Sequence, residues 1–355
     1  MVAANPNQSL ADEISELQDK LKEFQDSARL NDVRDEVQTL QTSIDSLSQQ
    51  IAGLRQRGYV FEKDLEGKAA AFYQQWAILY PNLTNQINLQ SSGLTMSLQP
   101  VEMQMTLVTT TASAGAAASQ PLVNSMKSTL DTLESKIEAA QKSIKAMYQS
   151  LNDQVNPVIQ HLKDIDWMLV QLAEAKFQLL STEGGIIAVK AAWYKSGKVA
   201  KDDPEGVLYL TDQRLIFEQK QEIATKKVLF ITIAKQKVQQ LLFDAPVALV
   251  ENIQTSKLGF LKNEDNIEIR FASGAPLQMA HFHIWQDCAT WLQLINRAKA
   301  KDFDAGRAVA VDQEEVAKVK AAPARCPSCG GNINQVVLRG MDSIKCEYCG
   351  FVIRL

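Results

Sequence analysis

Apolar residues recur at steps of three and four through residues 10–54 of the chain. Their mean spacing of about 3.5 places one apolar stripe along a helix and is the spacing of coiled coils. A slip in phase at residues 29–32 divides the pattern into two runs, and we expect Gly58 to end the second. The first run is Leu10, Ile14, Leu17, Leu21, Phe24 and Ala28, and the second is Val33, Val37, Leu40, Ile44, Leu47, Ile51 and Leu54.

A shorter helix is predicted from Leu65 to Leu79, with Pro81 ending it because proline lacks the N–H that a helix interior needs. Residues 82–121 then break the helical pattern with polar residues, a glycine, a proline and a run of small residues. We expect a flexible insertion at about 82–121, whose tip could touch a membrane or a partner. Small-residue runs bury little surface, however, so an exposed connection is the favoured interpretation. A short strand is predicted through Met103, Met105 and Leu107.

Heptad spacing returns after Pro121 and continues to Leu172, with a kink expected at Pro157. Two long stripes separated by a flexible segment favour an antiparallel hairpin, and a parallel dimer is the alternative that the spacing leaves open. Residues 1–183 are therefore predicted to be an α-helical coiled-coil region that binds itself or a protein partner. The second stripe is Met126, Leu130, Leu133, Ile137, Ala140, Ile144, Met147, Leu151, Val155, Val158, Leu162, Ile165, Leu169 and Leu172.

At Gly184-Gly185 the period changes from helical to alternating, which indicates β-strands. An amphipathic helix follows from Ile284 to about Ala300, with Trp285, Trp291 and Ile295 on its apolar face. Seven short strands and one such helix outline a small barrel or orthogonal sandwich with one end plugged. The strands are predicted at Ile186–Tyr194, Val207–Thr211, Arg214–Gln219, Val228–Ile233, Val247–Thr255, Ile267–Phe271 and Leu277–His283.

Residues 206–217, GVLYLTDQRLIF, resemble the signature hairpin of the GRAM family, whose members are relatives of pleckstrin-homology (PH) domains. Thr211-Asp212-Gln213 suits the turn of this hairpin, and the apolar residues on either side alternate inward. The resemblance implies a PH/GRAM-like β-barrel with a C-terminal helix over residues 184–300, in contact with a membrane or a protein. Residues 220–246, with a helical-looking stretch at Lys235–Phe243, depart from the family by being longer than it needs.

The resemblance also implies a contact with anionic lipid in the loop between the first two strands. In PH relatives this loop carries basic residues that meet anionic headgroups, and each ammonium near such a surface contributes about 1 kcal/mol. Asp202, Asp203 and Glu205 follow at once and would cancel part of the attraction, so a solvated loop is the favoured alternative. The candidate lipid contacts are Lys195, Lys198 and Lys201.

Two Cys-x-x-Cys pairs close the sequence, Cys326 with Cys329 and Cys346 with Cys349, each followed by glycine. Each turn directs two sulfurs to one point, and two turns complete a closed tetrahedron, which predicts a structural Zn²⁺ site. A rubredoxin-like iron site and a redox dithiol are the alternatives. With four thiolate ligands, no coordination position is left open for hydrolytic catalysis. Residues 326–355 are thus predicted to form a zinc ribbon with a hairpin between the two pairs, after a flexible linker at 301–325.

The net charge of −4 is unevenly distributed. Lys and Arg number 14 against 22 Asp and Glu in residues 1–183, 15 against 12 in 184–300, and 8 against 7 in 301–355. No segment has the concentrated basic face that is typical of nucleic-acid binding, so protein contact or structural capping is favoured over nucleic acid for the ribbon. The ribbon residues considered for nucleic acid are Arg325, Arg339, Lys345, Tyr348, Phe351 and Arg354.

The first residues have neither a basic start nor an apolar core, and the longest apolar run is shorter than a bilayer span. We therefore expect a cytoplasmic protein, in part peripheral to a membrane. His281, His283 and Cys288 are a weaker candidate for a second metal site, because two histidines two apart on a strand share a face. No nucleophile set, phosphate-binding loop or small-molecule substrate site was recognised.

Taken together, these patterns predict a multi-domain α+β protein that is not an enzyme. The leading hypothesis is an adaptor or scaffold with three recognition modules: a coiled coil, a GRAM-like domain and a zinc ribbon. One alternative is a nucleic-acid-associated zinc-ribbon factor. The other is a filament-forming or membrane-remodelling helical hairpin.

Overall fold

The computed structural model describes residues 6–112, 116–194, 203–228, 231–258 and 264–355. The chain divides into two compact units, each built from segments that are distant in sequence. The first unit comprises Met1–Ser48 and Gly67–Ile159, and the second comprises Gln49–Glu66 and Gln160–Leu355. This division differs from the predicted limits, because the sheet, the expected linker and the cysteine-rich segment fall in one unit.

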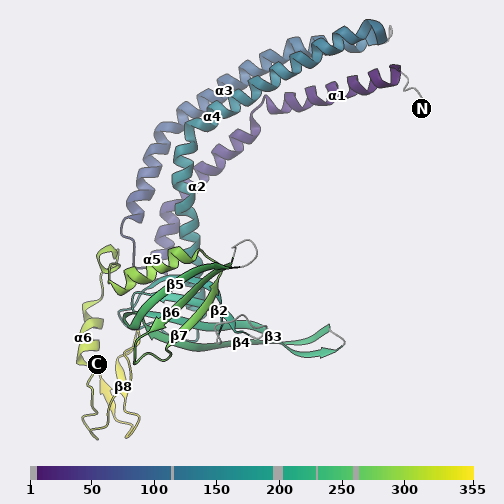
Figure 1. Ribbon diagram of the computed structural model, residues 1–355. Coiled ribbons are helices and arrows are strands. Elements are labelled where there is room, and N and C mark those ends of the chain that lie inside the picture. Colours follow the sequence, from purple (N-terminus) through teal and green to yellow (C-terminus); the bar gives the residue numbers. More distant parts are fainter. Residues whose placement is uncertain (1–5, 113–115, 195–202, 229–230, 259–263) are drawn as a thin grey trace. The chain divides into compact units, whose positions relative to one another are not determined.

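Long helices form the first unit and extend into the second, as the heptad spacing predicted (Figure 1). Every predicted stripe residue between Leu10 and Leu54 is buried. The expected slip in phase is a break between α1 and α2, where Leu30 adopts a positive φ of 56°. Gly58, with a φ of 95°, follows the end of α2 as predicted. The helices are α1 Pro6–Ser27, α2 Asn31–Gln56, α3 Leu65–Ala112 and α4 Ala116–Ala173.

The expected flexible insertion and short strand are wrong, because α3 continues through Pro81 and Pro100 to Ala112. An interior proline costs roughly 3 kcal/mol, so another contribution must hold the helix together. The extended helix buries a continuous apolar face against its neighbours, and this burial offsets the cost. The face consists of Trp76, Leu83, Ile87, Leu94, Leu98, Val101, Met105 and Val108.

Polar contacts define how the helices of the first unit run. Arg34 meets Asn88 and Gln25 meets Glu102, so α3 is antiparallel to α1 and α2. Conversely, Lys127 pairs with Glu13, and Lys145 with Glu36 further along both helices, so α4 runs parallel to α1 and α2. The two predicted stripes are therefore not an antiparallel pair, since α3 is the returning helix between them.

Within the described residues, the second unit holds a seven-stranded antiparallel sheet in the order β4-β3-β2-β1-β7-β6-β5. Six of the seven predicted strands overlap β1, β2, β3, β5, β6 and β7, and the predicted terminal helix is α5, which begins at Cys288 rather than Ile284. The predicted strand Val228–Ile233 is wrong, because β3 ends at Val228 and β4 begins at Ile231. The sheet is open, with β4 and β5 at its edges, rather than a closed barrel. Residues 235–243 belong to strand β4, not to a helix. The elements are β1 Gly185–Trp193, β2 Glu205–Thr211, β3 Arg214–Val228, β4 Ile231–Pro246, η1 Val247–Leu249, β5 Val250–Leu258, β6 Glu264–Phe271, β7 Met279–Ile284 and α5 Cys288–Lys299.

Aromatic side chains fill the core beside this sheet. Trp193, Phe217, Phe243 and Phe282 lie with ring centroids 5.1–6.4 Å apart. Helix α5 contacts β5 and β6, and its Trp291 is fully buried (Figure 1). Trp285, expected on the apolar face of this helix, instead precedes it and is 54% exposed.

The cysteine-rich segment forms a hairpin in a different place from the one predicted. Strands β8 Ser343–Lys345 and β9 Val352–Arg354 pair across the second cysteine turn. Leu338, expected in the hairpin between the cysteine pairs, forms an isolated bridge with Leu180. Part of the segment between the pairs thus contacts the loop that follows α4.

Candidate metal centre

The two cysteine turns have the same backbone geometry. In the first, the N–H of Gly330 donates to the carbonyl of Cys326 at 2.9 Å, and the N–H of Cys326 donates to Gly331 at 2.8 Å. In the second, Gly350 and Cys346 make the equivalent bonds, both 2.9 Å. Gly330 and Gly350 have φ values of 71° and 76°, a region that glycine adopts without the steric cost of a Cβ. The glycines noted in the sequence therefore close the turns.

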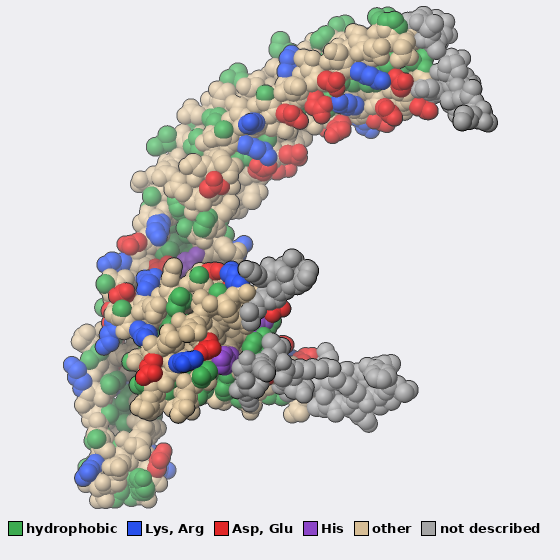
Figure 2. Space-filling view, in the orientation of Figure 1, with side chains coloured by type: hydrophobic (Ala, Val, Ile, Leu, Met, Phe, Trp, Pro, Cys, Tyr) green, Lys and Arg blue, Asp and Glu red, His purple; other side chains and the backbone are tan. Residues whose placement is uncertain are grey.

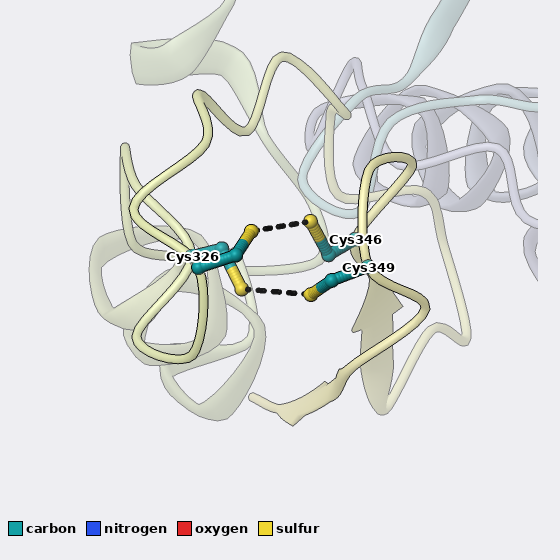
Figure 3. Close-up of side chains that lie close together, drawn as sticks. Cys326, Cys346 and Cys349 are labelled. Atoms are coloured by element: carbon teal, nitrogen blue, oxygen red, sulfur yellow. Dashed lines mark hydrogen bonds between the residues drawn. The ribbon is translucent and has the colours of Figure 1, made fainter.

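The four thiols converge on one point. Cys326 Sγ lies 3.7 Å from Cys349 Sγ, and Cys329 Sγ lies 3.7 Å from Cys346 Sγ, so each turn faces the other (Figure 3). All four sulfurs lie within 4.8 Å of one another, and this group could bind a metal ion. Cys326 and Cys346 are buried, whereas Cys329 and Cys349 are exposed. The predicted convergence is confirmed.

Backbone donors favour the thiolate at one of these positions. The N–H of Cys349, followed by that of Tyr348, lowers the pKa of Cys346 to about 7. A metal ligand must be a thiolate, so amides that stabilise the anion also favour metal binding. The second turn therefore directs N–H groups towards the Cys346 sulfur, which could also bind a metal.

The segment between the cysteine pairs is bound to the loop that follows α4. The N–H of Arg339 donates to the carbonyl of Leu179 at 3.0 Å, and the N–H of Ser181 donates to Val337 at 3.2 Å. The Arg339 guanidinium also donates to the carbonyl of Glu183. Arg339, considered above for nucleic acid, is thus engaged within the protein.

A buried ion pair lies at the same loop. Glu183 is fully buried and Arg214 is 8% exposed. The guanidinium of Arg214 donates to Glu183 through Nε at 3.0 Å and Nη2 at 2.7 Å, and through Nη1 to Asp244 at 2.6 Å. The Glu183 carboxylate also accepts from Thr211 Oγ1 at 2.5 Å and from the N–H of Leu180 at 2.7 Å. Both oxygens of the buried Glu183 carboxylate therefore accept hydrogen bonds.

A second ion pair fixes the expected linker. Arg307 pairs with Asp212, whose other oxygen accepts from the N–H of Gly184 at 2.8 Å. Phe303 is 4% exposed and lies 5.6 Å from Phe61, ring centroid to centroid. The segment contains η2 Asp304–Gly306 and α6 Gln313–Ala321. In this structure residues 303–308 are a packed strap, in contrast to the flexible linker expected there.

The β2–β3 turn and the first residue of β3 supply side chains that bind this region together. Thr211, Asp212 and Arg214 hold the loop after α4 and, through it, the strap and the cysteine-rich segment. The sequence did mark Arg214, because it belongs to the motif at residues 206–217. No local signal marked Glu183 or Arg339, which meet across 156 positions.

Other predicted site residues stand apart from this centre. Lys195, Lys198 and Lys201 lie outside the described residues. His281 and His283 share a face of β7 as expected, but His281 faces Glu268 at 3.5 Å and His283 packs on Trp285 at 4.5 Å. Among the described residues, the four cysteines are the only group of three or more candidate metal ligands that converge.

Comparisons with known proteins add little to these observations. No family model and no curated protein matches the chain. Solved structures with some similarity include the DH/PH domains of p115-RhoGEF, 15% identical over 84% of this chain and 95% of that one, with a TM-score of 0.22. The complex of PDZ-RhoGEF DH/PH domains with GTP-gamma-S activated RhoA is 12% identical over 84% of this chain and 96% of that one, with a TM-score of 0.24. At such low TM-scores we draw nothing about fold or function from either.

Among the described helices, none is long and apolar enough to cross a bilayer.

Proposed function

We propose that this protein is a non-enzymatic scaffold whose four-cysteine centre binds structural Zn²⁺ and holds the cysteine-rich segment against the sheet-containing unit. The observation that carries the proposal is the closed set of four converging thiols. A metal held by all four would have no position for a substrate or a reactive water, as in structural rather than catalytic sites. In this proposal the metal centre stabilises the structure, and the helices and the sheet bind partners.

The spacing of the sulfurs fits a metal bound tetrahedrally by four thiolates, as zinc is in structural sites. Zn–S bonds of about 2.3 Å in a tetrahedron place neighbouring sulfurs about 3.8 Å apart. The pairs Cys326–Cys349 and Cys329–Cys346 are 3.7 Å apart, close to that edge. Cys326, Cys329, Cys346 and Cys349 would all ligate the ion, which supplies the folding energy that a segment of this size lacks.

The binding surfaces in this proposal are the helices and the open sheet. A PH/GRAM-like role for the sheet rests on the resemblance of residues 206–217 and on seven antiparallel strands followed by one helix. Such a unit would contact a protein or an anionic membrane at the periphery of the cytoplasm. The helices would bind a protein partner or a second copy.

Metal analysis of the purified chain tests the zinc centre. We expect one zinc per chain, and its loss in Cys346→Ser. Cys288→Ser is the matched control, because Cys288 is buried in α5 outside the cluster and should keep the full metal content. One iron per chain would instead identify a rubredoxin-like site. A disulfide in the metal-free chain would identify a redox dithiol, and either result would overturn the proposal.

Flotation with vesicles tests the membrane contact separately. We expect the chain to float with vesicles that contain anionic lipid and to remain in solution with neutral ones. Neutralising Lys195, Lys198 and Lys201 together should abolish flotation, whereas neutralising Lys318 and Lys320 on α6 should not. If the chain stays in solution with both vesicle types, the sheet makes no such contact and a protein partner is the surviving part of this proposal.

A further inference from the structure

Helix α3 exposes large apolar side chains on the side opposite its buried face. Their exposed fractions, 52–75%, are far above those of the residues that α3 packs into the first unit, which are 7% or less. They are therefore not part of the core of this unit. The exposed residues are Ile78, Leu89, Met96, Met103 and Leu107, which we call the outer stripe.

The outer stripe follows a heptad repeat of its own. Leu89, Met96 and Met103 are separated by steps of seven, Leu107 follows four residues later, and Ile78 lies eleven residues before Leu89. These steps keep one side chain after another on the same line of a helix. From Ile78 to Leu107 the line is about 44 Å long at about 1.5 Å per residue, which is enough for about four heptads.

Charge is absent along most of this helix. No Asp, Glu, Lys or Arg occurs from Ala69 to Val101, and Glu102 is the one charged residue between Lys68 and Ala112. Helices α1, α2 and α4 carry acidic and basic residues along their lengths. Figure 2 shows this contrast, with red and blue gathered along α1 and mostly green and tan at the outer edge where α3 lies. A charged partner would find nothing to pair with on this face.

The polar residues on or beside this line are amides and hydroxyls. Each of these groups both donates and accepts hydrogen bonds, so two identical faces can satisfy one another. A two-fold interface requires such self-complementarity, because the same surface meets itself. Carboxylates or ammonium groups on this line would instead repel their own copies. The polar positions on or beside the stripe are Asn82, Asn85, Ser92, Gln99 and Thr106, all exposed.

We propose that the outer stripe of α3 is the surface on which two copies of this chain pack. The inference deepens the proposed scaffold role, on which it rests, by naming the face of self-association. A membrane is the weaker occupant, because helices that lie on a bilayer use Lys and Arg to attract it, and α3 has only Lys68. The lack of charge favours an equally uncharged face, and among the described helices α3 is the one that offers it.

Sedimentation equilibrium of the full chain tests the proposal. We expect a dimer, and in Met96→Glu/Met103→Glu we expect the dimer dissociation constant to rise about a hundredfold or more, because two carboxylates per copy would be buried unpaired. Ser135→Glu/Gln149→Glu, which adds the same charge to exposed positions of α4, should leave the dimer intact. A monomeric wild-type chain at about 100 μM, or a double variant that dimerises like wild type, would overturn the proposal.

Cross-linking keeps the test decisive if the charged variant misfolds. Single Leu89→Cys, Met96→Cys and Met103→Cys variants, oxidised in turn, should form covalent dimers at one position in an antiparallel pair or at all three in a parallel pair. Ser135→Cys on α4 is the control, which should cross-link no faster than the wild-type chain, whose exposed Cys329 and Cys349 set the background. If no outer-stripe position cross-links faster than this control, two copies do not pack there. Sedimentation does not use zinc content as its readout, so failure of the metal centre would be seen separately by metal analysis.

Discussion

At the residue scale, Arg214 forms a buried ion pair, so its loss should lower the stability of the second unit strongly. Glu183 is fully buried, and removal of Arg214 would leave its carboxylate without its charge partner. We expect Arg214→Met to lower the free energy of unfolding of the second unit by about 3–5 kcal/mol. Arg214→Lys should cause a smaller loss than Arg214→Met, because an ammonium keeps the positive charge but lacks the planar fork of donors. Chemical denaturation measures both.

Lys220→Met is the comparison for this prediction. Lys220 pairs with Glu174 at 2.5 Å, but their side chains are 29% and 57% exposed, so water already screens the pair. We expect a loss of less than about 1 kcal/mol. Equal effects of the Arg214 and Lys220 substitutions would contradict the view that burial sets the energy of the Arg214 pair.

At the scale of elements, Gly206 shows why the β2–β3 hairpin needs a glycine near the start of β2. A Cβ at this position would overlap the carbonyl oxygen of Glu218 and lie 2.8 Å from Gln219 Cα, both on β3. Backbone atoms cannot move aside without disturbing the β2–β3 ladder. We therefore expect Gly206→Ala to destabilise the second unit by about 1–3 kcal/mol, which thermal unfolding would measure.

Gly93→Ala provides the opposite case in α3. Nothing lies within 4 Å of a Cβ at Gly93, and the residue is in a helix interior. Alanine is favoured over glycine there by roughly 0.5–1 kcal/mol, so the first unit should become more stable. A destabilised Gly93→Ala would mean that this face of α3 is covered more tightly than the described contacts indicate.

Elements with strong periodicity could be predicted from the sequence, and those with conflicting signals could not. The stripes of α1, α2 and α4 have little else to compete with them. In α3 the buried residues Leu83, Ile87 and Leu94 keep helical spacing, but Pro81 and Pro100 and many small polar residues pointed to a loop. Tertiary burial outweighed those local preferences, and burial is not visible in a window of sequence.

The candidate site divides in the same way. Four cysteines at fixed spacing predicted their own convergence, because both turns are local and the ligand set is complete. The residues that hold the cysteine-rich segment in place gave no such signal. Arg339 reaches the carbonyl of Glu183 from 156 positions away, and any backbone carbonyl could have accepted that bond. Contacts of this kind depend on the fold already being present.

At the scale of the whole molecule, the metal should control more than its own segment. If the zinc proposal holds, stripping the metal with a chelator removes what shapes residues 326–355. The N–H groups of Ser181 and Arg339, which bond across to the loop after α4, should then exchange with deuterium much faster. Amides of the β1–β2 ladder should change little. Unchanged protection of Ser181 after complete metal loss would show that the loop holds its shape without the ribbon.

The strap of residues 303–308 also bears on how the chain folds during synthesis. Lys63 Nζ donates to the carbonyl of Ala305, 242 positions later, and the N–H of Ala308 donates to Val60. At roughly 5–20 residues per second, a ribosome needs on the order of 10–50 s to make the intervening chain. The segment around Phe61 therefore lacks its contacts with the strap long after the helices that flank it have emerged. Nascent chains stalled before residue 303 would expose this segment to chaperones, and completed chains would withdraw it.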